Sequence, residues 1–242
     1  LGVTWFVAVF AALGIGRAFG DFPLVGVLYA AAAAIAAAQI VDVWAGARAN
    51  VLRWCAMAVA ALVGLSASFG AGALGAALVA AAVIGIVAGA TEVVARRPLL
   101  PATALVLQAS LPTGLVAAAV VLATRYEIGA GVILLAMVMA FDLGDFLIGS
   151  GAGSLLEGPV AGGLMIALVA AVAAIIGAPP FHGALVWAFA VGAMVLCPLG
   201  QVAASWLLPD AATRAPALRR LDSLILLGPA WAFAAGLVAA SG

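Results

Sequence analysis

The sequence predicts an all-α fold, a polytopic bundle of about nine transmembrane helices. Hydrophobic residues make up 68% of the chain, charged residues make up only 7%, and the mean hydropathy is +1.36. A water-soluble domain of this composition would have almost no polar surface to offer the solvent. Apolar stretches of about 20 residues, the length that crosses the hydrocarbon core of a bilayer, recur along the whole chain. The net charge is zero, and we expect no nucleic-acid partner.

Polar, proline and glycine residues separate these apolar stretches and set the expected spans. The spans cover residues 3–19, 24–43, 51–68, 71–90, 102–123, 129–149, 158–177, 182–208 and 222–240. The first stretch has no basic leader, so we expect a span there and not a cleavable signal peptide. Two places are weakly marked: residues 66–70, and Pro112, which either kinks one span or marks a re-entrant element. We expect residues 1–242 to form a single integral membrane domain, in which residues 1–100 are packing spans.

The basic residues are all arginines, and they sort onto one side of the expected bundle. The second, fourth and eighth connections and their flanks hold Arg48, Arg53, Arg96, Arg97, Arg214, Arg219 and Arg220. The opposite side holds Arg17 and Arg125. Because basic residues favour the cytoplasmic side, we expect a cytoplasmic N-terminus and an external C-terminus in a bacterial cytoplasmic membrane.

Two carboxylic acids, Asp142 and Asp145, lie inside an otherwise apolar stretch. An acid at the centre of a transmembrane helix costs about 2.5 to 3.5 kcal/mol, and a spacing of three residues places both acids on one helix face. We therefore expect them to face the bundle interior or a wet cavity, either as a structural polar contact between helices or as a functional site. Cys55 and Cys197 also lie in expected spans, but they lack the spacing of metal ligands and are expected to be packing residues.

Further polar residues of the second half are expected on the same side of the membrane. The candidate binding residues are Asp142, Asp145, Ser154, Glu157, Gln201, Ser205, Arg219, Arg220, Asp222 and Ser223. Magnesium prefers oxygen ligands and bridges phosphates, so Asp142, Asp145 and Asp222 are candidate metal ligands. Alternatively, Arg219, Arg220 and Asp222 only cap a helix at the membrane interface.

Four segments of residues 101–242 follow one another like the motifs of a known family. Phe141-Asp142-Leu143-Gly144-Asp145 looks like an Asp-Thr-Gly-Ala-Tyr motif, and Glu157-Gly158-Pro159 looks like a Trp-Glu-Gly motif. Gly200-Gln201-Val202-Ala203-Ala204-Ser205 resembles Gly-Asp-x-x-Glu-Ser, and Arg219-Arg220-Leu221-Asp222-Ser223-Leu224 resembles Asp-Arg-x-Asp-Ser-Leu. In this order the chain resembles the phosphatidate cytidylyltransferases, also called CDP-diacylglycerol synthases.

The resemblance implies a magnesium-dependent attack of phosphatidate on CTP that yields CDP-diacylglycerol and pyrophosphate. It carries catalytic positions over to Asp142, Glu157, Ser205 and Asp222. The sequence departs from the family pattern at three acids, which are replaced by Gln201, Ala204 and Arg219. It also contains no lysine that could hold a triphosphate. Phosphoryl transfer needs cations to balance the charge on the phosphoryl oxygens, so these departures weaken the site.

Three functions follow from these observations. The first is a catalytically inactive relative of this family, a pseudoenzyme that has no cofactor and serves as a lipid-binding or accessory subunit of a membrane complex. The second is an active cytidylyltransferase with a magnesium site rebuilt around Asp142, Asp145, Glu157 and Asp222. The third is a transporter or channel, because acids within spans also serve ion pathways. The expected partners are membrane lipids, together with a second copy of the chain or another membrane protein.

Overall fold

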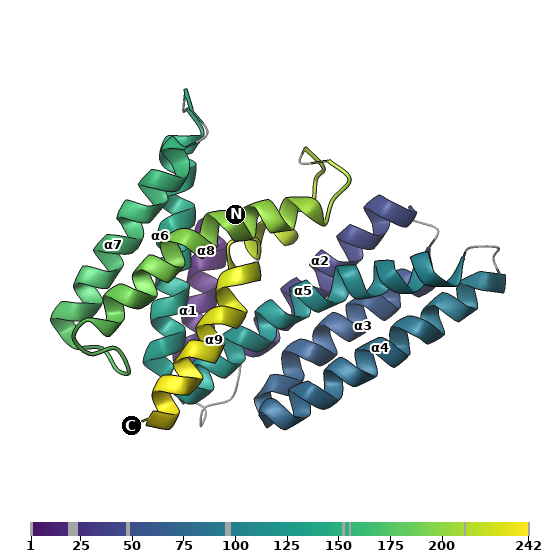
Figure 1. Ribbon diagram of the computed structural model, residues 1–242, viewed down its shortest axis with the longest axis horizontal. Helices are drawn as coiled ribbons and strands as arrows, with labels where there is room; N and C mark the ends of the chain where they lie inside the picture. Colours follow the sequence, from purple (N-terminus) through teal and green to yellow (C-terminus); the bar gives the residue numbers. More distant parts are fainter. Residues whose placement is uncertain are drawn as a thin grey trace. The chain divides into compact units, whose positions relative to one another are not determined.

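The computed structural model describes residues 2–18, 24–46, 49–94, 98–151, 153–154, 156–210 and 212–241. Its α-helices are α1 (Gly2–Ala18), α2 (Leu24–Ala45), α3 (Asn50–Ser66), α4 (Ala71–Val94), α5 (Leu99–Tyr126), α6 (Ile128–Gly149), α7 (Glu157–Ile176), α8 (Leu185–Trp206) and α9 (Leu224–Ser241) (Figure 1). Two short 3-10 helices, η1 (Ala67–Phe69) and η2 (Leu218–Arg220), complete the described elements, which include no strand. The expected all-α fold is confirmed, and each expected span overlaps one α-helix.

The helices α2 to α8 are long and apolar enough to cross a membrane, which gives seven candidate spans among the described residues. Helix α1 has 17 residues, and the apolar part of α9, Leu224–Ala240, is also short. At a rise of 1.5 Å per residue, a helix of this length extends about 26 Å, against about 30 Å for the hydrocarbon core. The chain is therefore an integral membrane protein, while the count of nine crossings stays a prediction.

The structure shows what happens at the two weakly marked places, residues 66–70 and Pro112. Helix α3 ends at Ser66, η1 follows, and Gly70 adopts a φ of 103° before α4 begins. Pro112 lies inside the continuous helix α5, so the re-entrant alternative is wrong. Next to it, the Thr113 hydroxyl donates a hydrogen bond of 2.9 Å to the Ala109 carbonyl. Hydroxyl groups of this kind help to satisfy backbone groups where proline interrupts a transmembrane helix.

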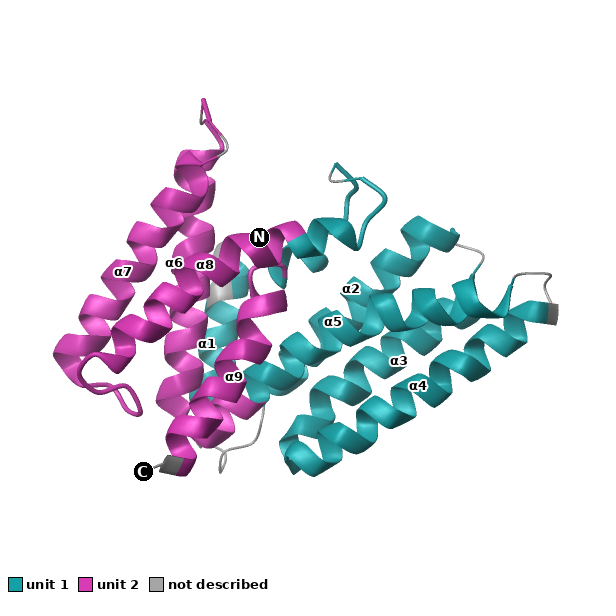
Figure 2. Ribbon diagram, in the orientation of Figure 1, with its two compact units in different colours: residues 1–121, 203–221 teal, residues 122–202, 222–242 magenta. Residues whose placement is uncertain are grey.

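The chain divides into two compact units (Figure 2). Unit 1 comprises Leu1–Val121 and Ala203–Leu221, and unit 2 comprises Leu122–Val202 and Asp222–Gly242. Within unit 1, α2 packs against α1, α3 and η2, and α3 packs against α4. A methyl group added to Gly64 of α3 would lie 2.7 Å from the Ala117 Cβ of α5. Small residues therefore let these helices approach closely, as is typical of packing within a bilayer.

Unit 2 contains the antiparallel pair α6 and α7, and α9 packs against α6. The pair is close because glycine lies at the contact: a methyl group on Gly144 would lie 2.8 Å from the Ala161 carbonyl oxygen. The Trp231 indole of α9 donates a hydrogen bond of 3.1 Å to the Ala130 carbonyl of α6. This packing brings α6, with its two acids, alongside both α7 and α9.

The described part of the chain contains only some of the arginines used to predict the orientation. Arg48, Arg96 and Arg97 lie outside the described residues, and so does the side chain of Arg17. Arg53 lies 3.7 Å from Asp42, across the turn between α2 and α3. The orientation in the membrane stays a prediction.

Candidate functional site

Side chains from α6, α8 and the start of α9 form a polar network within unit 2. The Ser223 hydroxyl donates a hydrogen bond of 2.6 Å to Asp142 Oδ1. The Gln201 amide donates to Asp145 Oδ2 at 3.3 Å and to the Ser223 hydroxyl oxygen at 3.5 Å. The Ser223 to Asp142 distance lies at the short end of the usual range for hydrogen bonds between oxygen atoms. We call Asp142, Asp145, Gln201 and Ser223 the polar network.

The helices place these side chains together for local reasons. Asp142 and Asp145 share one face of α6 because they are three residues apart. Just before α9, the Asp222 carboxylate accepts a hydrogen bond of 2.8 Å from the Ser223 backbone N–H, which fixes the entry to the helix. Gly200 precedes Gln201 on α8, and a methyl group there would lie 2.6 Å from the Asp222 carbonyl oxygen. The absence of a side chain at residue 200 therefore allows α8 to come close enough for Gln201 to reach Ser223.

Burial differs along the network. Ser223 is 1% exposed and Asp222 is 7% exposed, whereas Asp142, Asp145 and Gln201 are half-buried. Burying a carboxyl group, fully as for Asp222 or partly as for Asp142 and Asp145, costs free energy unless the group has hydrogen-bonding partners. The bonds to Asp142, Asp145 and Asp222 reduce that cost, so they explain how α6 accommodates two carboxyl groups and the segment before α9 a third.

Asp145 also lies against the beginning of α7. Its Oδ1 atom occupies the space where a side chain on Gly158 would begin. The residue that precedes α7 is Leu156, whose side chain cannot accept a hydrogen bond from the helix N-terminus. A negative charge near a helix N-terminus is favourable because of the helix dipole. Asp145 thus stabilises the α6 to α7 turn as well as the polar network.

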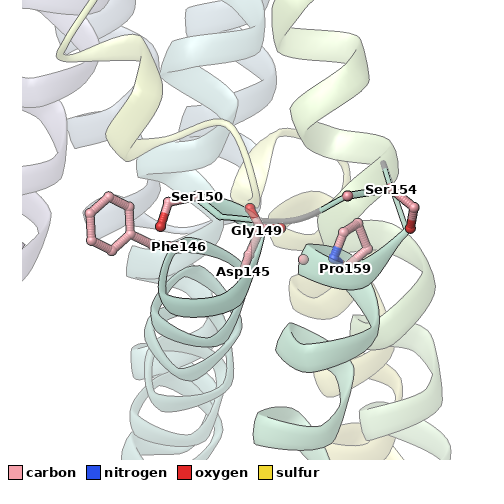
Figure 3. Close-up of a pocket in the computed structure, with 8 residues that line it drawn as sticks. Asp145, Phe146, Gly149, Ser150, Ser154 and Pro159 are labelled. Carbon is pink, nitrogen blue, oxygen red and sulfur yellow. The ribbon is translucent and has the colours of Figure 1, made fainter.

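An open pocket of about 450 Å³ lies at this turn (Figure 3). Figure 3 shows Asp145 and Gly149 between Phe146 on one side and Ser154 and Pro159 on the other. The residues that line the pocket are Asp145, Phe146, Gly149, Ser150, Gly153, Ser154, Gly158 and Pro159, and none of them is basic. The pocket offers a carboxylate, two hydroxyl groups and backbone atoms, but no cation for a triphosphate.

The candidate binding residues fall into both units. Unit 2 holds Asp142, Asp145, Ser154, Glu157, Gln201, Asp222 and Ser223, whereas unit 1 holds Ser205, Arg219 and Arg220. In unit 1, the Arg219 guanidinium donates a hydrogen bond of 3.2 Å to the Ser205 hydroxyl, and Arg220 is exposed. In unit 2, Ser154 and Glu157 are exposed at the α6 to α7 turn.

The three candidate magnesium ligands, Asp142, Asp145 and Asp222, all accept hydrogen bonds from protein groups. Among the described residues, no group of three or more acidic, histidine or cysteine side chains is placed to hold a metal ion. Asp142 and Asp145 instead accept hydrogen bonds from Ser223 and Gln201. In this arrangement the donors to Asp142 and Asp145 are protein groups, and the magnesium site stays a prediction.

The sequence analysis did not place Cys197 in the site, and it did not predict the close contact at Gly200. Cys197 is fully buried on α8. Its spacing of four residues from Gln201 places both on one face of α8, which is the signal that could have indicated it. Gly200 begins the segment that resembles Gly-Asp-x-x-Glu-Ser, but only the packed structure shows which backbone it meets.

Comparison with known proteins gives no relative from which a function could be transferred. No family model, curated protein or solved structure matches the chain.

Proposed function

We propose that the chain is a non-catalytic membrane protein of the phosphatidate cytidylyltransferase type, which binds a phospholipid headgroup and serves as an accessory subunit of a membrane complex. The alternative is an active cytidylyltransferase with a rebuilt magnesium site. The proposal also includes a cytoplasmic N-terminus, an external C-terminus and nine crossings of a bacterial cytoplasmic membrane.

The hydrogen bonds of Gln201 are the main observation that supports this proposal. Where the family pattern has an acid, this chain has an amide that donates to Asp145 and to Ser223. Ser223 in turn donates to Asp142. Because the donors come from the protein, the carboxylates have hydrogen-bonding partners without a divalent cation. A network of this kind holds α6, α8 and the start of α9 together, and this structural role does not require a catalytic one.

The α6 to α7 pocket supports lipid binding. Apolar side chains around the turn are strongly exposed, with Phe146 at 69%, Leu147 at 64% and Leu156 at 71%. In a membrane protein, such side chains face acyl chains or a membrane partner. The polar pocket therefore adjoins apolar surface, an arrangement that suits an amphiphilic ligand with a headgroup and acyl chains.

An activity assay tests the lack of catalysis. Purified protein is given CTP, magnesium and phosphatidate, and pyrophosphate release is measured. We expect release no faster than in a protein-free control, for both the wild type and Asp142→Asn. Pyrophosphate release that Asp142→Asn abolishes would overturn the proposal in favour of the enzyme.

Lipid retention tests the pocket in the same preparation. Phospholipid that remains bound after purification in mild detergent is quantified by mass spectrometry. Ser154→Trp, which fills the pocket from an exposed position, is expected to lower the bound lipid. His182→Trp, at the exposed connection between α7 and α8, is the matched control and should leave it unchanged. Equal retention by both variants would remove the pocket from the proposal.

A further inference from the structure

The exposed tryptophans of unit 1 gather at the ends of three helices. Trp44 is 49% exposed at the end of α2, Trp54 is 59% exposed at the start of α3, and Trp206 is 77% exposed at the end of α8. Indole rings concentrate at membrane–water interfaces, where the apolar ring and the polar N–H are both accommodated. Three such rings on neighbouring helix ends indicate where unit 1 meets the headgroup layer.

Hydrogen bonds show that these helix ends are neighbours. The Trp44 indole donates a hydrogen bond of 2.8 Å to the Leu207 carbonyl, which follows α8. The Ala217 backbone N–H donates a hydrogen bond of 3.0 Å to the Gln39 side chain of α2. The turn between α2 and α3 is further held by the pair of Asp42 and Arg53, 3.7 Å apart. The end of α2, the start of α3 and the connection after α8 therefore form one end of unit 1.

The described charges at this end favour an anionic partner. Arg53 lies 5.4 Å from the ring of Trp54, while Arg214 and Arg220 are exposed in the connection after α8. Asp42 lies 3.7 Å from Arg53, and Asp210 accepts a hydrogen bond of 2.7 Å from the Ala212 N–H. Among the described residues at this end, the arginines at positions 53, 214, 219 and 220 outnumber these two acids. We define the interfacial rim as Trp44, Arg53, Trp54, Trp206, Arg214 and Arg220.

We infer that the interfacial rim binds the headgroups of anionic phospholipids in one leaflet. Guanidinium groups form paired hydrogen bonds to phosphate, and the indole rings fix the depth of the helix ends beside those phosphates. Arg219 takes no part, because it is half-buried and bonded to Ser205. The interfacial rim lies wholly in unit 1 and shares no residue with the pocket of unit 2, so lipid binding at the rim does not depend on the proposed function.

Lipid selectivity tests the charge of the rim. The protein is reconstituted in phosphatidylcholine vesicles, and association of spin-labelled phosphatidylglycerol is compared with that of spin-labelled phosphatidylcholine. The wild type should prefer phosphatidylglycerol, and the preference should fall with added salt. Each of Arg214→Gln and Arg220→Gln should reduce it by about fivefold at low salt, the equivalent of about 1 kcal/mol.

Arg125→Gln, which changes an exposed arginine of unit 2, is the matched control and should retain the preference. Equal association of both lipids with the wild type would overturn the inference. A preference that survives the double variant, which carries both Arg214→Gln and Arg220→Gln, would overturn it as well. If the double variant loses only a co-purifying membrane protein and the lipid preference is unchanged, the rim is a protein interface and the inference is wrong.

Fluorescence quenching tests the depth of the rim. The difference in fluorescence emission between the wild type and Trp206→Phe is assigned to Trp206. This difference is measured in lipids that carry bromine either near the headgroup or near the chain ends. We expect stronger quenching by bromine near the headgroup. Stronger quenching near the chain ends, or none in either lipid, would contradict an interfacial position.

Discussion

Gln201 determines whether the candidate site suits a network of hydrogen bonds or a divalent cation. Its amide donates to Asp145 and to the Ser223 hydroxyl, so it joins α8 to α6 and to the start of α9. An ionised carboxyl group at this position could donate neither bond and would add a third negative charge beside Asp142 and Asp145. The amide thus suits a structural network, whereas an acid suits a divalent cation.

Gln201→Glu is expected to lower the free energy of unfolding by about 1–3 kcal/mol without magnesium, because hydrogen bonds are lost and like charges are brought together. Adding magnesium should reverse part of the decrease in melting temperature that Gln201→Glu causes, since the cation balances the added charge. The wild type should not respond to magnesium. Thermal melting in detergent, with and without magnesium, measures both effects.

Gln201→Met is the control, because it removes the donor without adding charge. It should be destabilised and insensitive to magnesium. A melting temperature of the wild type that rises with magnesium as much as that of Gln201→Glu would instead support an existing metal site and the enzymatic alternative.

Helix α8 reaches the network because its backbone touches the chain just before α9. A methyl group on Gly200 would lie 2.6 Å from the Asp222 carbonyl oxygen and 3.2 Å from that of Ser223. Backbone atoms cannot move aside as a flexible side chain can. The contact therefore fixes the distance between α8 and α9 and, through it, the reach of Gln201.

Gly200→Ala is expected to destabilise the protein by about 1–3 kcal/mol, because the helices must separate to admit the methyl group. Gly192→Ala, on the same helix, has open space around the added group and should be neutral or slightly stabilising, since alanine favours helices. Chemical denaturation or thermal melting of both variants provides the comparison. Equal stability of the two would show that the close approach at Gly200 is not needed.

At the scale of the whole molecule, the orientation in the membrane sets which side the candidate pocket faces. The turn between α6 and α7 is expected in the cytoplasm, and the connection between α7 and α8 is expected outside. Ser154 and His182 are exposed in these two connections of unit 2. They are therefore suitable positions for testing accessibility.

Single cysteines test this orientation in a background that carries Cys55→Ala and Cys197→Ala. In intact cells, a membrane-impermeant maleimide should label His182→Cys, because that side chain faces the exterior. Ser154→Cys should be labelled only after the cells are permeabilised. The reverse pattern would place the pocket outside and would contradict the arginine distribution as a guide to orientation.

The sequence by itself determined the all-α fold, the location of the helices and the membrane environment. Hydrophobicity and helix length are local properties, so stretches of about 20 apolar residues indicate helices before any packing is known. The sequence also indicated Asp142 and Asp145, because an acid is conspicuous in an apolar helix.

Only the tertiary structure decided which polar residues meet. It connects Gln201 and Ser223 to the two acids, and it places Ser205 and Arg219 in the other unit. Such contacts depend on helix rotation and on backbone distances set by glycines such as Gly200. Composition and periodicity contain no information on those distances, because they arise from the packing of residues far apart in the sequence.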